Sequence, residues 1–128
     1  MRAARIFALG LLAVAVFATA APASADAAAY RKYVACCTSG KANPSHDCPV
    51  RRAAQGNVGA FFRSNNRDVF YKVCVKFPGA NAPRCAGRQK AIKGKLYVNP
   101  ITSDQTGRHK VTWFVKGQRV GIWYFNLN

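Results

Sequence analysis

Apolar and polar residues alternate along the chain from Gly56 onward, as they do in β-strands that bury one face. The segment 69–77 shows this best. One face of the expected strand is apolar and consists of Val69, Tyr71, Val73, Val75 and Phe77. The opposite face carries Phe70, Lys72, Cys74 and Lys76. We therefore expect the first face to lie in the core and the lysine face to lie mostly in solvent.

The segment 107–128 predicts a hairpin of two strands around a turn at Gly117-Gln118. Before the turn, Val111, Trp113 and Val115 alternate with Lys110, Thr112, Phe114 and Lys116. After the turn, Val120, Ile122 and Tyr124 alternate with Gly121, Trp123, Phe125 and Leu127. Shorter strands are expected in "NVGAFF", "RCAGRQKAI" and "GKLYVNP", which are separated by the turn-forming sequences "RSNNRD" and "PGANAP".

Six to eight short strands in about 100 residues predict an all-β domain, a single antiparallel β-sandwich, with a small closed barrel as the alternative. No segment of useful length has a helical period, and the helix-like fragment 51–56 is about one turn long. Residues 26–56 are expected to be largely irregular, with a short strand near Tyr33–Thr38. One domain, residues 26–128, is the simplest division.

The first 25 residues have the layout of a secretory signal peptide. Arg2 and Arg5 precede an apolar run over residues 6–21, and Ala23-Ser24-Ala25 provides small residues for cleavage. The apolar run is shorter than the roughly 20 residues that a spanning helix needs, which disfavours a membrane anchor. We therefore expect a secreted, extracellular protein whose mature chain begins at Asp26.

The C-terminal half resembles small secreted immunoglobulin-like domains of high-GC Gram-positive bacteria. The resemblance rests on G-x-H-x-V-x-W-x-V at 107–115 and G-x-x-V-G-x-W at 117–123, and covers about half of the expected mature chain. It implies an immunoglobulin-like β-sandwich that serves as an adhesive or accessory module without catalysis. The segment 36–48, which holds two adjacent cysteines, is not part of this pattern.

The chain is strongly basic, with 20 lysines and arginines against four aspartates and a net charge of +16. Two arginines leave with the signal peptide, so the expected mature chain carries +14. This excess favours an anionic partner, such as a wall polymer, a membrane surface, a polysaccharide or a nucleic acid. The competing interpretation is that the charge only keeps the protein soluble.

The chain contains five cysteines, so one must lack a partner within the chain. Two bridges can be formed in fifteen ways, and an exported domain of this size is expected to be disulfide-stapled. Short loops favour Cys74 with Cys85, and Cys48 with Cys36 or Cys37. We take Cys36 as the partner of Cys48 and Cys37 as the free thiol. The spare cysteine is either simply buried or forms an intermolecular bond, which would give a disulfide-linked homodimer or capture a protein partner.

No cofactor or metal is expected. Cys36, Cys37, His46 and Cys48 are zinc-ligand types, but adjacent cysteines do not have the usual C-x-x-C spacing. The sequence lacks the motifs G-x-S-x-G and H-E-x-x-H and contains no glutamate. A histidine pair, His46 and His109, suggests a ribonuclease only weakly, because His109 is expected on the surface of a strand edge. We therefore predict that the protein is not an enzyme and has no small-molecule substrate.

The predicted function is a secreted basic binding module for anionic surfaces or polymers. The residues expected to bind anions are Lys72, Lys76, Lys95, Lys110, Lys116 and Arg119. Tyr97, Phe114 and Trp123 could stack among them, although core packing is the favoured expectation for these aromatics. The alternative is a small secreted toxin or an inhibitor of another extracellular protein. In that case "FPGANAPRC" is the exposed loop and Arg84 its anchor for a trypsin-like pocket.

Overall fold

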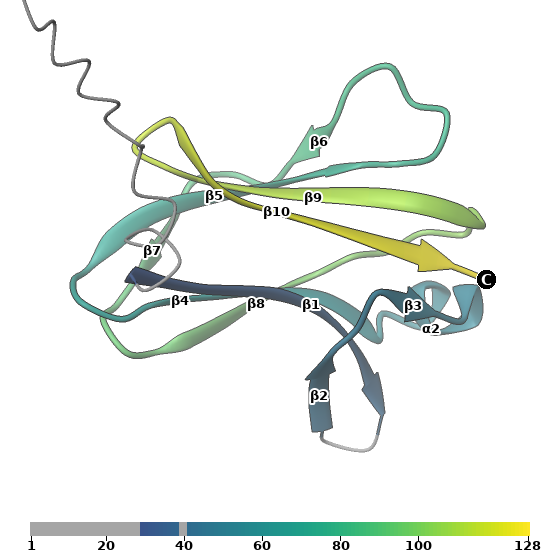
Figure 1. Cartoon of the computed structure of the whole chain (residues 1–128), viewed down its shortest axis with the longest axis horizontal. Helices are drawn as coiled ribbons and strands as arrows, with labels where there is room; N and C mark the ends of the chain where they lie inside the picture. The colour runs from purple at the N-terminus through teal and green to yellow at the C-terminus, as the bar shows by residue number, and fades with distance from the viewer. Residues whose placement is uncertain (1–28, 39–40) are drawn as a thin grey trace, which may run out of the picture.

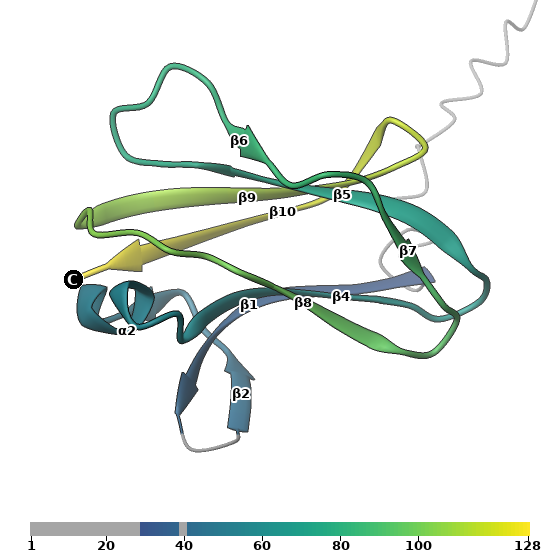
Figure 2. The same ribbon diagram turned by 180° about the vertical axis from the view of Figure 1, so that it is seen from behind.

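The computed structural model describes residues 29–38 and 41–128, which form two β-sheets packed face to face (Figures 1 and 2). The four-stranded sheet has the order β2 (Lys41–Pro44), β1 (Tyr30–Thr38), β4 (Val58–Ser64) and β8 (Leu96–Pro100). The six-stranded sheet has the order β3 (Asp47–Cys48), β10 (Gln118–Leu127), β9 (Gly107–Val115), β5 (Val69–Lys76) and β6 (Arg84–Cys85), and β7 (Gln89–Ala91) also pairs with β5. Neighbouring strands are antiparallel except β3 and β10.

The predicted alternation of β5 and β9 is confirmed, except that Cys74, which lies on the face of β5 expected in solvent, is buried. In β5, Val69, Tyr71 and Val73 are buried while Phe70 and Lys72 are exposed. In β9 the buried positions are His109, Val111, Trp113 and Val115. In β10 the inward face is the one that carries Phe125 and Leu127, after a register shift between Arg119 and Gly121.

The core between the two sheets is aromatic. Phe62 of β4 is fully buried and lies between Tyr30 and Tyr71, with ring centroids 5.6 Å and 4.2 Å away. The Tyr71 hydroxyl donates to Gln89 Oε1 at 2.8 Å and lies 3.0 Å from Asn99 Oδ1 of β8, so it connects the two sheets. Burial, with a smaller contribution from Tyr97, raises the pKa of Tyr71 to about 12, so the hydroxyl keeps its proton.

The segment 26–56 is more regular than its sequence suggested. Tyr30–Thr38 is one nine-residue strand that pairs with β4 from Tyr30 to Cys36 and then continues into the β1–β2 hairpin. Its pattern is masked because Tyr33 and Ala35 are buried on the outer face of the sheet, in a small second cluster with Phe61. Both faces are thus partly apolar, and the period of two is lost. The predicted single turn of helix is confirmed as α2 (Val50–Ala54).

The expected signal peptide, residues 1–25, lies outside the described residues. Within the part of the chain that the structure describes, no helix has the length and apolar character needed to cross a bilayer. Two disulfides are present, and such bonds are compatible with an extracellular location.

Candidate functional site

The lysines of β5 and β9 lie on one surface, the outer face of the six-stranded sheet. Lys76 of β5 is the register partner of Lys110 of β9, and Lys72 is the partner of Phe114. Residues opposite each other in a sheet point to the same side. Because the flanking residues of both strands point into the core, Lys72, Lys76 and Lys110 share the outward side.

The β9–β10 hairpin adds two further cations at one end of this face. Lys116 and Gly117 form the turn with positive φ angles of 51° and 72°. After the turn, Arg119 pairs with Phe114, whose ring lies 5.5 Å from the Lys72 ammonium nitrogen. The outer face therefore includes five of the six predicted anion-binding residues.

Lys95 lies elsewhere. It directly precedes β8 of the four-stranded sheet, and its ammonium nitrogen lies 5.5 Å from the centroid of the Tyr97 ring. Two of the three suggested stacking aromatics, Tyr97 and Trp123, pack against the core, as expected for a packed β-structure. Phe114 alone of these three lies on the outer face of the six-stranded sheet, opposite Lys72.

The sequence analysis missed Arg108 and Tyr124 as members of this face. Arg108 is the register partner of Asn126, and its guanidinium lies 3.9 Å from the centroid of the Tyr124 ring. The Lys110 ammonium nitrogen lies 6.0 Å from the same ring, which is 41% exposed. The signal was present in the alternation, because an outward Lys110 places Arg108 on the same side. We call the surface formed by Lys72, Lys76, Arg108, Lys110, Lys116, Arg119 and Tyr124 the basic face.

The carboxylates of the described residues lie at the margins of the basic face or away from it. Asp47 is on the short edge strand β3, where its carboxylate lies 3.5 Å from the Asn126 side-chain amide. Asp68 accepts the backbone N–H of Lys93 at 2.8 Å, and Asp104 is in the loop between β8 and β9. The cations in the middle of the face are therefore available to a partner.

Both predicted disulfides are present. Cys74 and Cys85 bridge the neighbouring strands β5 and β6, where they are also register partners. Cys36 and Cys48 bridge β1 of one sheet to β3 of the other. Since the chain has five cysteines, these bridges leave Cys37 as the predicted odd cysteine.

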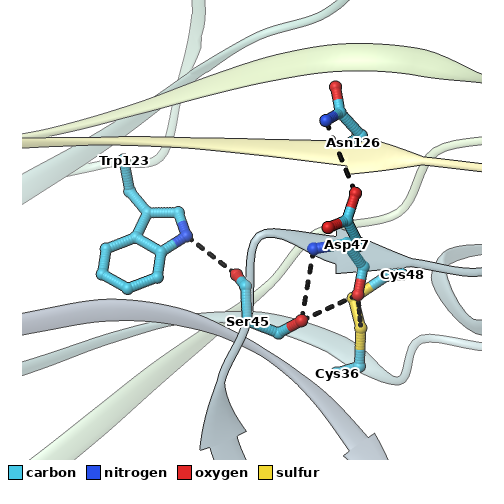
Figure 3. The surroundings of a disulfide bond; sticks show 6 residues. All are labelled: Cys36, Ser45, Asp47, Cys48, Trp123 and Asn126. Carbon is cyan, nitrogen blue, oxygen red and sulfur yellow. Dashed lines mark hydrogen bonds between the residues drawn. A yellow bond between two sulfur atoms is a disulfide. The ribbon is translucent and has the colours of Figure 1, made fainter.

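Hydrogen bonds attach the segment around Cys48 to β10, as Figure 3 shows. The Trp123 indole N–H donates to the Ser45 carbonyl at 2.9 Å, and the Ser45 hydroxyl donates to the Asp47 carbonyl at 2.7 Å. The His46 ring stacks on Trp123 with centroids 4.1 Å apart, and its Nδ1 donates to the Tyr124 carbonyl. These contacts account for His46 structurally.

The expectation that His109 lies on the surface is wrong. His109 is fully buried, because the alternation that points Arg108 and Lys110 outward points it into the core. Its Nδ1 donates to the Gly107 carbonyl at 3.0 Å, so its Nε2 accepts the Ser103 hydroxyl at 2.9 Å. Burial lowers the pKa of His109, and the Gly107 contact opposes this only in part. The hydrogen bond between Ser103 and His109 therefore attaches the loop that follows β8 to the strand β9.

A metal centre at the N-terminal cysteines does not fit the covalent structure. Cys36 and Cys48 are bonded to each other and cannot both act as thiolate ligands. Within residues 29–38 and 41–128, no cluster of three or more histidine, cysteine or acidic side chains is arranged to hold a metal ion.

Comparison with known proteins returned no relative: no family model, no curated protein and no solved structure matches the chain.

Stability is expected to fall as the pH drops below about 6.5, the ordinary pKa of histidine. His109 has a lower pKa in the folded protein than in the unfolded chain, so the unfolded chain binds the extra proton first. The contribution of neutral His109 to the free energy of unfolding is complete above pH 6.5 and is lost progressively as the pH falls toward the pKa of His109 in the folded protein. Urea denaturation between pH 5 and pH 7.5 measures this. His109→Asn should flatten the dependence and His46→Gln should keep it. An equally steep slope in His109→Asn would contradict the assignment.

Proposed function

We propose that the protein is a secreted, non-catalytic binding module that attaches to anionic polymers or surfaces through the basic face. The observation that carries the proposal is the convergence of Lys72, Lys76, Arg108, Lys110, Lys116 and Arg119 on one side of the six-stranded sheet. Cations gathered on one face attract a polyanion more strongly than the same charges spread over the molecule.

The strand order supports an immunoglobulin-like module. β1, β4 and β8 follow one another in one sheet, and β10, β9 and β5 in the other. This corresponds to the A-B-E and G-F-C orders of an immunoglobulin-like sandwich, with β6 or β7 in the place of an additional edge strand. The disulfides differ from the B–F bridge of antibody domains, since they join β1 to β3 and β5 to β6.

An extended face whose charged groups are all cationic suits a polymer better than a small substrate. Its cations come from three neighbouring strands, β5, β9 and β10, and from the turn between β9 and β10, so they form an extended surface. Lysine and arginine contacts to a polyanion release counterions, and affinity then falls steeply as salt rises. Such binding needs no catalytic group.

The test is co-sedimentation with purified cell walls, intact and stripped of their anionic polymers, across a salt series. A variant with Lys72, Lys76, Lys110 and Arg119 changed to glutamine should bind weakly, with a salt slope lower by about three, since each lost phosphate contact removes about 0.7–0.9 from the slope. The matched control changes Arg31, Arg51, Lys93 and Lys95, which are exposed and contribute the same charge. Stripped walls should bind neither protein.

Equal losses in the two variants would show that net charge rather than the basic face attracts the polymer. Binding that does not respond to salt, or no binding of the unchanged protein, would refute the proposal. In either case attention moves to a protein partner, including one captured through Cys37.

A protease inhibitor remains the second candidate. The loop between β5 and β6 projects from the molecule and is closed at its base by the Cys74–Cys85 bridge (Figure 1). Arg84 is exposed but pairs with Val75 at that base, and its guanidinium lies 5.4 Å from the Phe77 ring. Inhibition of trypsin that Arg84→Ala abolishes would support this function. Absence of inhibition by the unchanged protein would eliminate it.

A further inference from the structure

A groove lies at the end of the basic face that is opposite to the β9–β10 hairpin. Its volume is about 590 Å³, and its floor and one side carry Lys76, Arg108, Lys110 and Tyr124. The other wall is the turn Phe77–Asn81, which follows β5. We call this groove, which is open to solvent, the basic groove. No carboxylate is among the described residues that line it.

The turn that forms one wall of the basic groove has a defined conformation. The Ala80 N–H donates to the Phe77 carbonyl at 3.2 Å, and Gly79 has a φ of 72°. Proline followed by glycine at the centre of such a turn is the type II pattern, in which the glycine takes the positive φ. The Phe77 ring packs edge-on against His109 at 5.4 Å, and the Cys74–Cys85 bridge closes the loop that contains the turn.

The floor places like charges together. Lys76 and Lys110 are direct register partners on antiparallel strands, an arrangement that destabilises a sheet when the charges are not compensated. None of the described residues that line the groove supplies a carboxylate to compensate them. A bound anion placed between the two ammonium groups would remove this repulsion and gain from both charges.

The third cation is pre-oriented. The Arg108 guanidinium lies 3.9 Å from the centroid of the exposed Tyr124 ring. Stacking of this kind restricts the guanidinium plane while leaving its edge N–H groups free to donate, and that edge matches two oxygens of one anionic group. Less side-chain freedom is then lost when an anion binds.

We propose that the basic groove binds one phosphate-type group of high charge, a phosphomonoester or diphosphate, of the polymer that the basic face attracts. This inference rests on the proposed function and names the chemical group that its main subsite takes. Three converging cations match a compact group that carries about two negative charges and at least three acceptor oxygens. A carboxylate or a phosphodiester carries one charge and would leave the groove undercompensated.

The probe is inorganic pyrophosphate, titrated by calorimetry at low salt, with acetate as the singly charged comparison. Arg108→Gln, Lys76→Gln and Lys110→Gln should each weaken pyrophosphate binding about tenfold or more, because each removes a charge-assisted contact. Lys93→Gln and Lys95→Gln, which change exposed lysines outside the basic face, should leave it within about twofold. Tyr124→Phe should preserve binding and Tyr124→Ala should weaken it, since only the former keeps the ring under Arg108.

The melting temperature provides a second test that is independent of calorimetry. Without ligand at low salt, Lys76→Gln should raise the melting temperature, because the Lys76–Lys110 repulsion is gone. Pyrophosphate should raise the melting temperature of the unchanged protein and have little effect on this variant. A lower melting temperature for Lys76→Gln without ligand would contradict the proposed charge conflict.

The outcomes separate this inference from the proposed function. Pyrophosphate binding that is insensitive to Arg108→Gln and Lys110→Gln, or no better than acetate binding, overturns the groove assignment. If the walls bind with a steep salt slope while pyrophosphate does not bind, the basic face stands and the groove assignment falls. If pyrophosphate binds through the groove but walls do not bind, the groove assignment stands for a free phosphate ester. Tighter binding of duplex DNA than of cell walls, with DNA binding that pyrophosphate does not compete away, also overturns the groove assignment, because the backbone of DNA supplies only phosphodiesters.

Discussion

Phe62→Ala is expected to lower the free energy of unfolding by about 3–5 kcal/mol, the usual cost of truncating a buried phenylalanine. Phe62 is fully buried and stacks on Tyr30 within its own sheet and on Tyr71 of the opposite sheet. Its removal leaves a cavity where the two sheets meet. A domain of this size has roughly 5–15 kcal/mol in total, so the variant should be close to unfolding at 37 °C. Urea denaturation followed by tryptophan fluorescence gives the value.

The control for this prediction is Phe70→Ala, which removes the same side chain from the exposed side of β5. Phe70 is 47% exposed, and we expect its loss to cost less than about 1 kcal/mol. Similar costs for the two variants would show that Phe62 does not occupy the interior contact between the sheets.

Replacing Cys36 and Cys48 together by serine should lower the free energy of unfolding by about 3 kcal/mol, the chain-entropy value for a loop of this length. The bridge spans 12 residues of sequence and joins β1 to β3 across the two sheets. Without it, the segment 45–50 is attached to β10 by non-covalent contacts alone, those of Trp123, His46 and Asp47 and of the backbone. Chemical denaturation of the oxidised protein, with and without the substitutions, measures the difference.

Cys37→Ser is the matched control, since neither bridge uses this cysteine. It should cost clearly less stability than the double variant, because the Cys36–Cys48 bond stays intact. On a non-reducing gel it should also remove any disulfide-linked dimer, if Cys37 makes one. A large loss of stability in Cys37→Ser, equal to that in the double variant, would mean that the assigned pairing is wrong.

The fold could be predicted where the strands are one-sided. β5, β9 and β10 bury one face and expose the other, so period-two alternation identified these strands, and it named the inward face of β5 correctly. β1 was underestimated because Tyr33 and Ala35 are buried on its outer face as well, which removes the alternation. The path from β5 through β6 and β7 consists of strands of two and three residues, which are too short for a periodic signal.

The sequence could predict on which side of a single strand each lysine lies, but not which residues of neighbouring strands lie opposite one another. Alternation placed Lys72 and Lys76 on one face, and the same argument applied to β9 gave Lys110. It could not show that Lys76 lies directly opposite Lys110, because register is set by pairing rather than by local pattern. For the same reason the sequence did not show that Lys95, which looks equivalent in its pattern, lies directly before β8 of the other sheet.

The short parallel strand β3 also has a consequence for self-association. β10 is the last long strand of its sheet, and β3 occupies the hydrogen-bonding edge at its C-terminal end through Asn126 to His46 at 2.7 Å and Asn128 to Cys48 at 2.9 Å. Two residues of pairing hold such an edge weakly, so the Cys36–Cys48 bond keeps β3 in place covalently. Reduction would leave this cover held by non-covalent contacts alone, and its loss would expose an open strand edge, the feature on which other chains add strands and aggregates begin. An oxidising environment, which keeps this bond formed, would then protect the protein from fibril-like assembly as well as from unfolding.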